Sequence, residues 1–238
     1  MKQNKYLIII ISILIILSNT VIANAYGTFF EMFYSPMSLG GFANEGSLYL
    51  EDGTLKTDGD EQNLIIDYND YPDLLAGDMY GFRGLIRDEG IGVGLRADIY
   101  ELNQHISGLS LGVFAQKDFN LIYDNLVFYS SVDSGLGAFS LDWPNKEVKR
   151  EIVGDNEANR LRKWFLDVGA NAGIRLRIAD FTFFGEANLK EFFKESKWNY
   201  NRNPGEEDGF VDVEDEYLPY SNFNIVNPLF VFGVGLRF

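Results

Sequence analysis

Apolar and polar residues alternate along much of this chain with a period of two. The last segment has the clearest pattern, because every second residue from position 230 to position 238 is apolar. These apolar residues are Phe230, Phe232, Val234, Leu236 and Phe238, and Val, Gly or Arg separates them. Successive side chains of a β-strand point to opposite faces, so this spacing predicts a strand with one apolar face.

Seven further segments carry the same alternation, and together they predict an all-β, antiparallel, up-and-down fold. The expected strands cover residues 28–37, 78–88, 91–99, 107–116, 125–141, 166–178, 181–189 and 230–238. The strand count around residues 117–142 stays open, because the alternation is weaker there. Eight such strands can close into a barrel, which leaves no unpaired edge.

The second face of these strands distinguishes a membrane barrel from a soluble one. Glycine recurs on this face, for example at Gly92, Gly94, Gly169 and Gly173. Glycine suits the crowded interior of a narrow barrel, whereas a wall facing water would favour Lys, Glu and Thr. We therefore expect a closed transmembrane β-barrel whose apolar face contacts lipid. A soluble, secreted, lipocalin-like barrel remains an alternative.

The first 25 residues predict an export signal. Lys2 and Lys5 precede an aliphatic run at residues 7–17, and residues 23–25 form an Ala-Asn-Ala cleavage site. The run is shorter than the roughly 20 residues that a spanning helix needs, which favours a cleaved signal peptide over an anchor. We expect residues 1–25 to be the signal peptide and residues 26–238 to form one barrel domain.

The predicted connections alternate between short and long. The connections at residues 87–90, 117–124 and 179–180 are short, whereas those at 38–77, 143–162 and 196–227 are long. Bacterial outer-membrane barrels have short periplasmic turns and longer extracellular loops. The alternation of short and long connections predicts that the long loops face the cell exterior. The connection at residues 102–106 is the exception, because it is short although it lies on the outer side.

The terminal strand resembles the signal by which bacterial outer-membrane barrels are recognised for assembly, because Phe238 is preceded by apolar residues at every second position. The segment from 26 to 238 resembles the class of small outer-membrane barrels that includes surface-antigen and OmpA-like proteins. This resemblance implies outer-membrane localisation. It also implies outer-membrane lipid and the barrel-assembly machinery as partners.

The strand parity predicts that charges of both signs face the barrel interior. They are Glu31, Arg83, Arg87, Arg96, Asp98, Asp133, Asp167, Arg175, Arg177, Glu186, Lys190 and Arg237. An eight-stranded barrel is just wide enough for side chains to fill it, so we expect these groups to pair and to close the lumen. A two-residue turn at 179–180 would place Gly173 opposite Glu186 and Gly169 opposite Lys190. This register predicts ion pairs between Glu186 and Arg175 and between Lys190 and Asp167.

The chain carries 35 acidic and 20 basic residues, which argues against a nucleic-acid partner. Residues 38–78 contain ten acidic residues and one lysine, and residues 196–223 contain seven acidic and two basic residues. The clusters at 51–52, 58–61 and 206–208 have oxygen ligands suited to calcium, although none has the spacing of an EF-hand. We expect a solvated acidic surface without a bound metal or other cofactor, and loops 38–77 and 196–227 as contacts for an extracellular ligand.

The chemistry available for catalysis is sparse, because the chain has one histidine and no cysteine. The triplet His105-Ile106-Ser107 resembles the His and Ser pair of the outer-membrane lipid A deacylase family, which also faces lipid. No clear carboxylate follows it to orient the histidine, since Phe119 and Asn120 occupy the region concerned. The alternative for His105 and Ser107 is an interfacial histidine beside a turn serine.

The sequence therefore predicts a non-enzymatic outer-membrane barrel whose acidic loops serve adhesion, ligand contact or envelope structure. Two further functions remain open, a narrow channel or passage for small apolar solutes and a lipid-modifying enzyme. A wide diffusion pore is excluded, because water-filled porins need about 16 strands.

Overall fold

The computed structural model describes residues 27–41, 47–50, 64–67, 73–88, 90–122, 125–142, 160–201, 210–213, 218–220 and 222–238. The predicted signal peptide and the acidic clusters at 51–52, 58–61 and 206–208 lie outside these residues. The regular secondary structure of the described part is entirely β-strand. A search of the same part finds no helix long and apolar enough to cross a bilayer.

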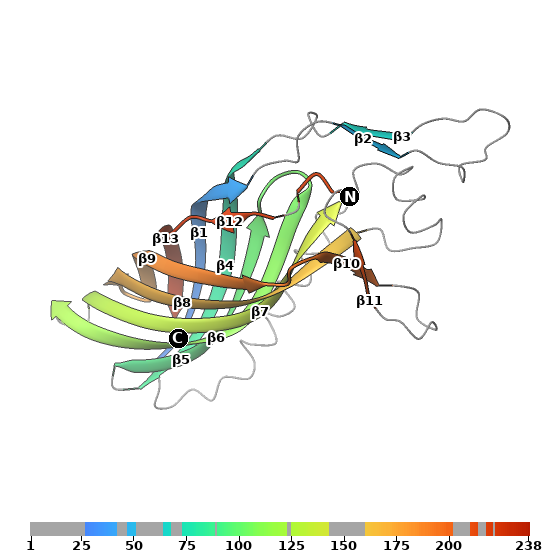
Figure 1. Ribbon diagram of the computed structural model, residues 1–238. Coiled ribbons are helices and arrows are strands. Elements are labelled where there is room, and N and C mark those ends of the chain that lie inside the picture. Colours follow the sequence, from blue (N-terminus) through green and yellow to red (C-terminus); the bar gives the residue numbers. More distant parts are fainter. Residues whose placement is uncertain are drawn as a thin grey trace, which may run out of the picture.

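Eight strands form one closed antiparallel ring. They are β1 (Gly27–Gly41), β4 (Leu74–Asp88), β5 (Ile91–Glu101), β6 (Ile106–Ile122), β7 (Leu126–Asp142), β8 (Arg160–Ile178), β9 (Phe181–Lys194) and β13 (Leu229–Arg237). Consecutive members of this series are hydrogen-bonded neighbours, and β13 pairs with both β9 and β1 to close the ring (Figure 1). The predicted eight-stranded, up-and-down barrel is confirmed.

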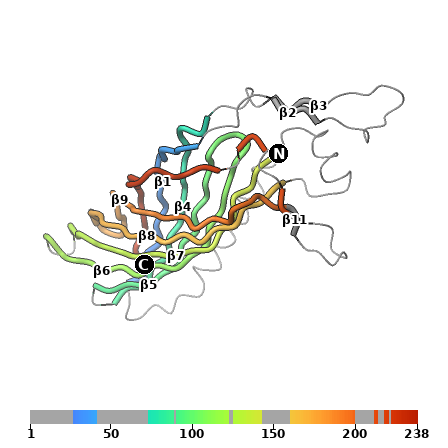
Figure 2. The backbone as a smooth tube through the Cα atoms, viewed as in Figure 1, coloured from blue at the N-terminus to red at the C-terminus, as the bar shows by residue number. Residues whose placement is uncertain are grey.

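Shorter strands occur within the long connections. β2 (Ser47–Leu50) pairs with β3 (Leu64–Asp67), and β10 (Trp198–Asn201) pairs with β11 (Phe210–Val213). β10 also contacts β8 through the pair Asn199 and Arg162, and Figure 2 shows β11 beyond one end of the ring. β12 (Asn224–Ile225) pairs with the end of β1. β10, β11 and β12 therefore extend the main sheet past the ring, whereas β2 and β3 form a separate two-stranded sheet.

Six of the eight barrel strands are longer than the sequence pattern predicts, and β6 differs most. The expected short connection at residues 117–124 is wrong in its bounds, because β6 continues to Ile122 and β7 begins at Leu126. Cross-strand pairs such as Lys117 with Ser130 and Phe119 with Phe128 extend this hairpin. The strand count around residues 117–142 is therefore two, and their turn lies near Asn125.

The stagger of the strands sets the width of the barrel. Cross-strand partners can be followed once around the ring, from Phe184 to Gly233, Phe33, Gly81, Asp98, Ser110, Gly137, Phe165 and Lys194. The path returns to β9 ten residues from its start (194 − 184). With standard strand spacing and rise, eight strands with this stagger tilt by about 40° and enclose a backbone radius of about 8 Å. Such a lumen holds side chains and little else.

The two faces of the sheet invert the arrangement of a soluble protein. Exposed and buried residues alternate along all 19 residues of β8. The outer wall exposes large apolar side chains, such as Leu136 at 68% and Phe232 at 58%, whereas the buried face carries Asp167 and Arg175 at 0%. The apolar surface of this barrel is therefore on the outside and its charges are inside.

The lumen has three layers along the barrel axis. The end nearest β10 and β12 is filled by an apolar cluster that includes Tyr100, Phe139, Phe165 and Leu161. The opposite end holds a small cluster of Phe29, Leu85 and Phe114. Most of the charged side chains lie between these clusters, whereas the pair of Arg87 and Asp118 lies beyond Leu85 and Phe114 on the same strands. By the parity of the connections, we call the first end the outer end and the second end the periplasmic end.

Candidate functional site: the barrel interior and its outer rim

The charged layer of the lumen fits because glycines face it. A Cβ atom on Gly135 would lie 2.7 Å from Ser110 Oγ and 2.9 Å from Arg96 Nη2, and one on Gly169 would lie 2.5 Å from Asp133 Oδ2. Both positions therefore require glycine to leave room for charged side chains from neighbouring strands. The recurrence of glycine on the polar face in the sequence has this physical cause.

One half of this layer, which we call the aspartate cluster, combines three carboxylates with two cations. Its members are Asp98, Asp133, Asp167, Arg96 and Lys190, which are at most 6% exposed. Arg96 pairs with all three aspartates, and its Nη2 lies 2.9 Å from Asp133 Oδ1. Lys190 Nζ lies 2.7 Å from Asp98 Oδ2 and 3.7 Å from Asp167 Oδ1. This cluster has a formal charge of −1.

Neutral donors complete the aspartate cluster. The hydroxyl of Ser110 donates to Asp167 Oδ2 at 2.5 Å, and that of Tyr100 donates to Asp98 Oδ2 at 3.2 Å. The amide of Asn171 donates to Asp133 Oδ2 at 2.8 Å. Each of the three carboxylates therefore accepts from at least one uncharged side chain as well as from a cation.

The other half, which we call the arginine cluster, has the opposite excess of charge. It contains Arg83, Arg87, Arg175 and Arg177 against Glu31, Asp118 and Glu186, a formal charge of +1. Arg83 and Glu31 are partners on the adjacent strands β4 and β1, whereas Arg83 with Glu186 and Arg175 with Glu31 pair across the lumen. The two clusters together hold six cations and six anions, so the charged layer is neutral.

Asp118 and Glu186 are the centres of the arginine cluster. Asp118 lies 2.6 Å from Arg87 Nη1 and 2.8 Å from Arg177 Nη2. Glu186 accepts from Arg83 at 3.0 Å and from the Tyr129 hydroxyl at 2.7 Å. Asp118 on β6 therefore neutralises arginines of β4 and β8, and Glu186 on β9 neutralises an arginine of β4.

The predicted ion pairs have different outcomes. The expected register is confirmed, since Gly173 lies opposite Glu186 and Gly169 opposite Lys190. The predicted pair of Glu186 with Arg175 is wrong, because Arg175 reaches across the lumen to Glu31 at 2.5 Å. Lys190 does lie within ion-pair distance of Asp167, but its nearest carboxylate belongs to Asp98.

The structure places the remaining predicted interior charges as follows. Glu31, Arg83, Arg96, Asp98, Asp133, Asp167, Arg175, Arg177, Glu186 and Lys190 are buried. Arg87 is half-buried near the periplasmic end. Arg237 was expected inside but is exposed, because it lies at the end of β13 where the lumen opens.

Sequence reasoning missed Asp118, which pairs with more arginines than any other carboxylate of the layer. It was assigned to a turn, whereas it belongs to the extended part of β6. Asp118 could have been found by continuing the alternation of β6, because every second residue, Phe114, Gln116 and Asp118, is buried.

His105 and Ser107 lie at the outer rim, not in the lumen. His105 is in the turn between β5 and β6, and its Nε2 lies 3.0 Å from Gln104 Nε2. Both residues line a rim pocket of about 650 Å³ together with Asp78, Glu101 and Asp142. Carboxylates are therefore present near this pair, supplied by neighbouring strands instead of by the segment after it. The described residues contain no group of three or more His, Cys, Asp or Glu arranged to hold a metal ion.

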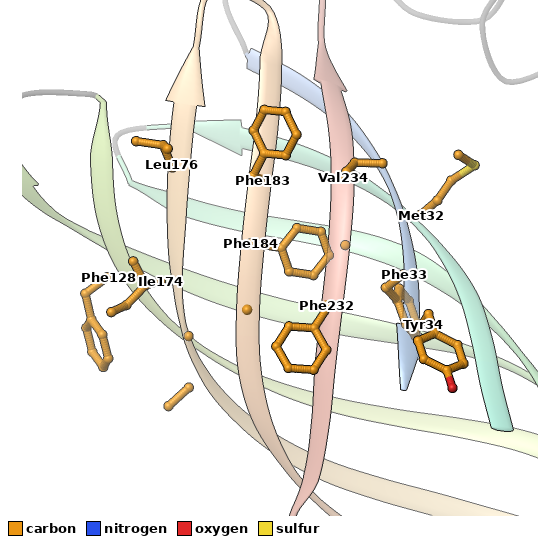
Figure 3. Close-up of a pocket in the computed structure, with 14 residues that line it drawn as sticks. Met32, Phe33, Tyr34, Phe128, Ile174, Leu176, Phe183, Phe184, Phe232 and Val234 are labelled. Atoms are coloured by element: carbon orange, nitrogen blue, oxygen red, sulfur yellow. The ribbon is translucent and has the colours of Figure 1, made fainter. Parts of the chain in front are cut away.

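The outer wall has a shallow groove over β8, β9, β13 and β1. Its floor includes Gly185, and apolar side chains such as Phe183, Phe232, Val234 and Ile174 border it (Figure 3). A Cβ atom on Gly185 would meet nothing closer than 3.7 Å. This wall therefore presents an uneven apolar surface with no charge in the groove.

The residues of the terminal strand pattern lie on this same wall. Phe230, Phe232, Val234, Leu236 and Phe238 are 38–70% exposed. Their alternation in the sequence thus corresponds to one outward face of β13.

Several solved structures are similar to this chain, and two of them are compared below. No family model and no curated protein matches the chain. The crystal structure of Neisserial surface protein A covers 90% of this chain and 96% of its own, with 10% identity and a TM-score of 0.46. The N-terminal β-barrel domain of Pseudomonas aeruginosa OprF covers 90% of this chain and 98% of its own, with 15% identity and a TM-score of 0.40.

Proposed function

We propose that this protein is an outer-membrane barrel that acts without catalysis, as a closed anchor for acidic surface loops. The observation that carries the proposal is the inverted arrangement of the sheet, with an apolar outer wall around a charge-balanced, filled lumen. In water, a wall of exposed side chains such as Leu136, Phe181 and Phe232 would drive aggregation. In a bilayer, the same wall is solvated by lipid.

The size of the apolar wall supports a membrane position. The stretch from Phe230 to Phe238, tilted by about 40°, rises roughly 20 Å, against an apolar band of about 25 Å on outer-membrane barrels. Outward-facing charges border the wall at its outer end, among them Asp78, Glu101 and Glu191. A soluble, secreted barrel would need those charges along the whole wall.

The filled lumen argues against a channel. The charged layer is paired, and a large cluster of buried apolar side chains fills the outer end of the lumen. We therefore expect no steady single-channel conductance in planar bilayers. Sustained, ion-selective conductance would favour the narrow-channel alternative.

The distribution of charge supports a role for the loops. The formal charge of the whole chain is −15, and the charged layer of the lumen contributes nothing to it. The negative excess therefore belongs to the rim, the loops and the other residues outside the lumen. Such a field attracts cationic surfaces and is screened by salt.

Two experiments test the proposal in sequence. Fractionation of cells that make the full-length protein should recover it in the outer membrane, with unboiled protein migrating differently from boiled protein on gels. A soluble product would contradict the membrane assignment. The barrel in lipid nanodiscs should then retain cationic surface components at low salt. A matched variant with Asp and Glu of residues 45–61 changed to Asn and Gln should lose part of that binding. Equal binding by both would contradict the loop assignment.

A further inference from the structure

A short segment of the chain closes the outer end of the lumen. This strap consists of Leu218–Tyr220 and Asn222–Ile225, and Leu218, Tyr220 and Phe223 are at most 2% exposed. Two ladder pairs, Leu39 with Ile225 and Gly40 with Asn224, join it to β1. The strap therefore contributes apolar side chains to a cluster that also contains side chains of the barrel strands, Trp198 of β10 and Val213 of β11.

Phe223 of the strap packs against one edge of a cluster of aromatic rings. The ring of Phe223 meets that of Phe139 edge-on, with 4.9 Å between centroids. Behind Phe139 stand Phe165 at 4.4 Å, Tyr100 at 5.6 Å and Phe192 at 6.1 Å, all from barrel strands. The strap therefore places a planar ring against Phe139, which the barrel strands themselves surround with three further rings.

Lys194 places a positive charge over the same ring. Its Nζ lies 4.5 Å from the centroid of Phe223, and it donates to the Phe223 carbonyl and, at 3.4 Å, to Asn222 Oδ1. Among the described residues no carboxylate lies within ion-pair distance of Lys194, unlike the cations of the charged layer. The strap satisfies this ammonium only with neutral oxygens.

The surroundings of Lys194 disfavour its charge. Burial, and secondarily the ammonium of Lys163, lower the pKa of Lys194 to about 8, while Glu191 acts weakly in the opposite direction. The nearby Glu195 carboxylate accepts from the Trp164 backbone and from Asn199. The same apolar cluster holds Trp198, whose buried indole N–H has no acceptor among the described residues. An anion at this place would compensate the lysine.

From these contacts we propose that the outer end of the lumen is a binding site for a small planar aromatic molecule that carries one carboxylate. The ligand ring takes the place of the Phe223 ring against Phe139, and the ligand carboxylate replaces the strap oxygens around Lys194. The strap moves aside and the charged layer below stays closed, so the ligand is bound and not conducted. The site does not depend on what the surface loops contact.

The test uses the barrel in lipid nanodiscs, with 2-naphthoate as probe and 2-naphthamide as its neutral counterpart. Equilibrium dialysis against empty nanodiscs corrects for partition into lipid. We expect saturable binding of the acid that is at least tenfold tighter than that of the amide. Equal retention of both compounds, or no saturation, would overturn the proposal.

Variants locate the site. Phe223→Ala removes the competing ring and should tighten binding of 2-naphthoate about tenfold, whereas Phe223→Leu, which still fills the space beside Phe139, should bind like the parent. Lys194→Met should weaken binding about tenfold or more, and Lys194→Arg should retain it. Unboiled gel migration shows that each variant is folded. If Phe223→Ala does not fold, the Lys194 pair decides: unchanged binding by Lys194→Met overturns the proposal.

The pH dependence gives a second readout. Because the free site holds Lys194 with a pKa of about 8, affinity for 2-naphthoate should fall when the pH rises from 7 to 9. The fall should vanish in Lys194→Arg, whose guanidinium stays charged. A parent protein with the same affinity at both pH values would contradict the role of Lys194.

Discussion

Two conservative substitutions in the lumen should destabilise the barrel by different amounts, because the arginine cluster has a net positive charge and the aspartate cluster a net negative charge. Asp118→Asn removes a negative charge from the arginine cluster, which then holds four arginines against two carboxylates. Asp167→Asn removes one from the aspartate cluster, which then holds two cations against two carboxylates. Asp118→Asn therefore increases the net charge of the arginine cluster from +1 to +2, whereas Asp167→Asn brings the net charge of the aspartate cluster from −1 to zero.

The expected magnitudes follow from burial. Breaking a buried ion pair by removing one partner costs about 3–5 kcal/mol, and Asp118 compensates three arginines at a site that is 7% exposed. Asp167 is fully buried, but an Asn can still accept from Arg96 through its Oδ1 and can donate to the Ser110 hydroxyl through its Nδ2, so we expect a loss of about 1–3 kcal/mol. The predicted difference in the free energy of unfolding is therefore about 2 kcal/mol.

Equilibrium unfolding in urea, with the protein in lipid vesicles and tryptophan fluorescence as the signal, measures both costs. Arg177→Met added to Asp118→Asn is the control, because it removes one of the uncompensated arginines and should recover part of the loss. An Asp167→Asn variant as unstable as Asp118→Asn, or a double variant less stable than the single one, would refute the charge-balance reasoning.

Three further predictions concern the wall, the interior and the rim. Gly135→Ala should destabilise the barrel by about 1–3 kcal/mol in the same unfolding assay, because its Cβ atom meets Ser110, whereas Gly84→Ala should have little effect, because nothing lies within 4 Å of its Cβ. Deletion of Phe238 should reduce the amount of heat-modifiable protein that is recovered in the outer membrane by fractionation. If the recovered amount does not change, Phe238 has no role in assembly of the barrel. Ser107→Ala should leave the acylation of lipid A unchanged in mass spectra of cells that make the protein, and a change there would favour the enzymatic alternative.

The alternation of residues predicted the faces of the strands and one register correctly, because a period of two depends only on the local backbone. Gly173 opposite Glu186 follows in this way from the length of a turn. The partner of Arg175 does not, since Glu31 stands 144 residues away and meets it only through the stagger of the whole ring. That stagger is a property of the closed barrel and has no local signature. Lys194 and the strap were missed for the same reason, because they meet only across the outer end.

The pairing of β1 with β13 has a consequence for biogenesis. These neighbours in the ring lie about 200 residues apart in the sequence, so their contacts have very high contact order and form late. Until β13 docks, β1 offers a free hydrogen-bonding edge beside side chains such as Met32 and Tyr34, which belong in lipid. An incomplete chain therefore resembles an aggregation-prone intermediate. We therefore expect its passage through the periplasm to require a holding chaperone that releases the polypeptide only when all the ring strands can insert together.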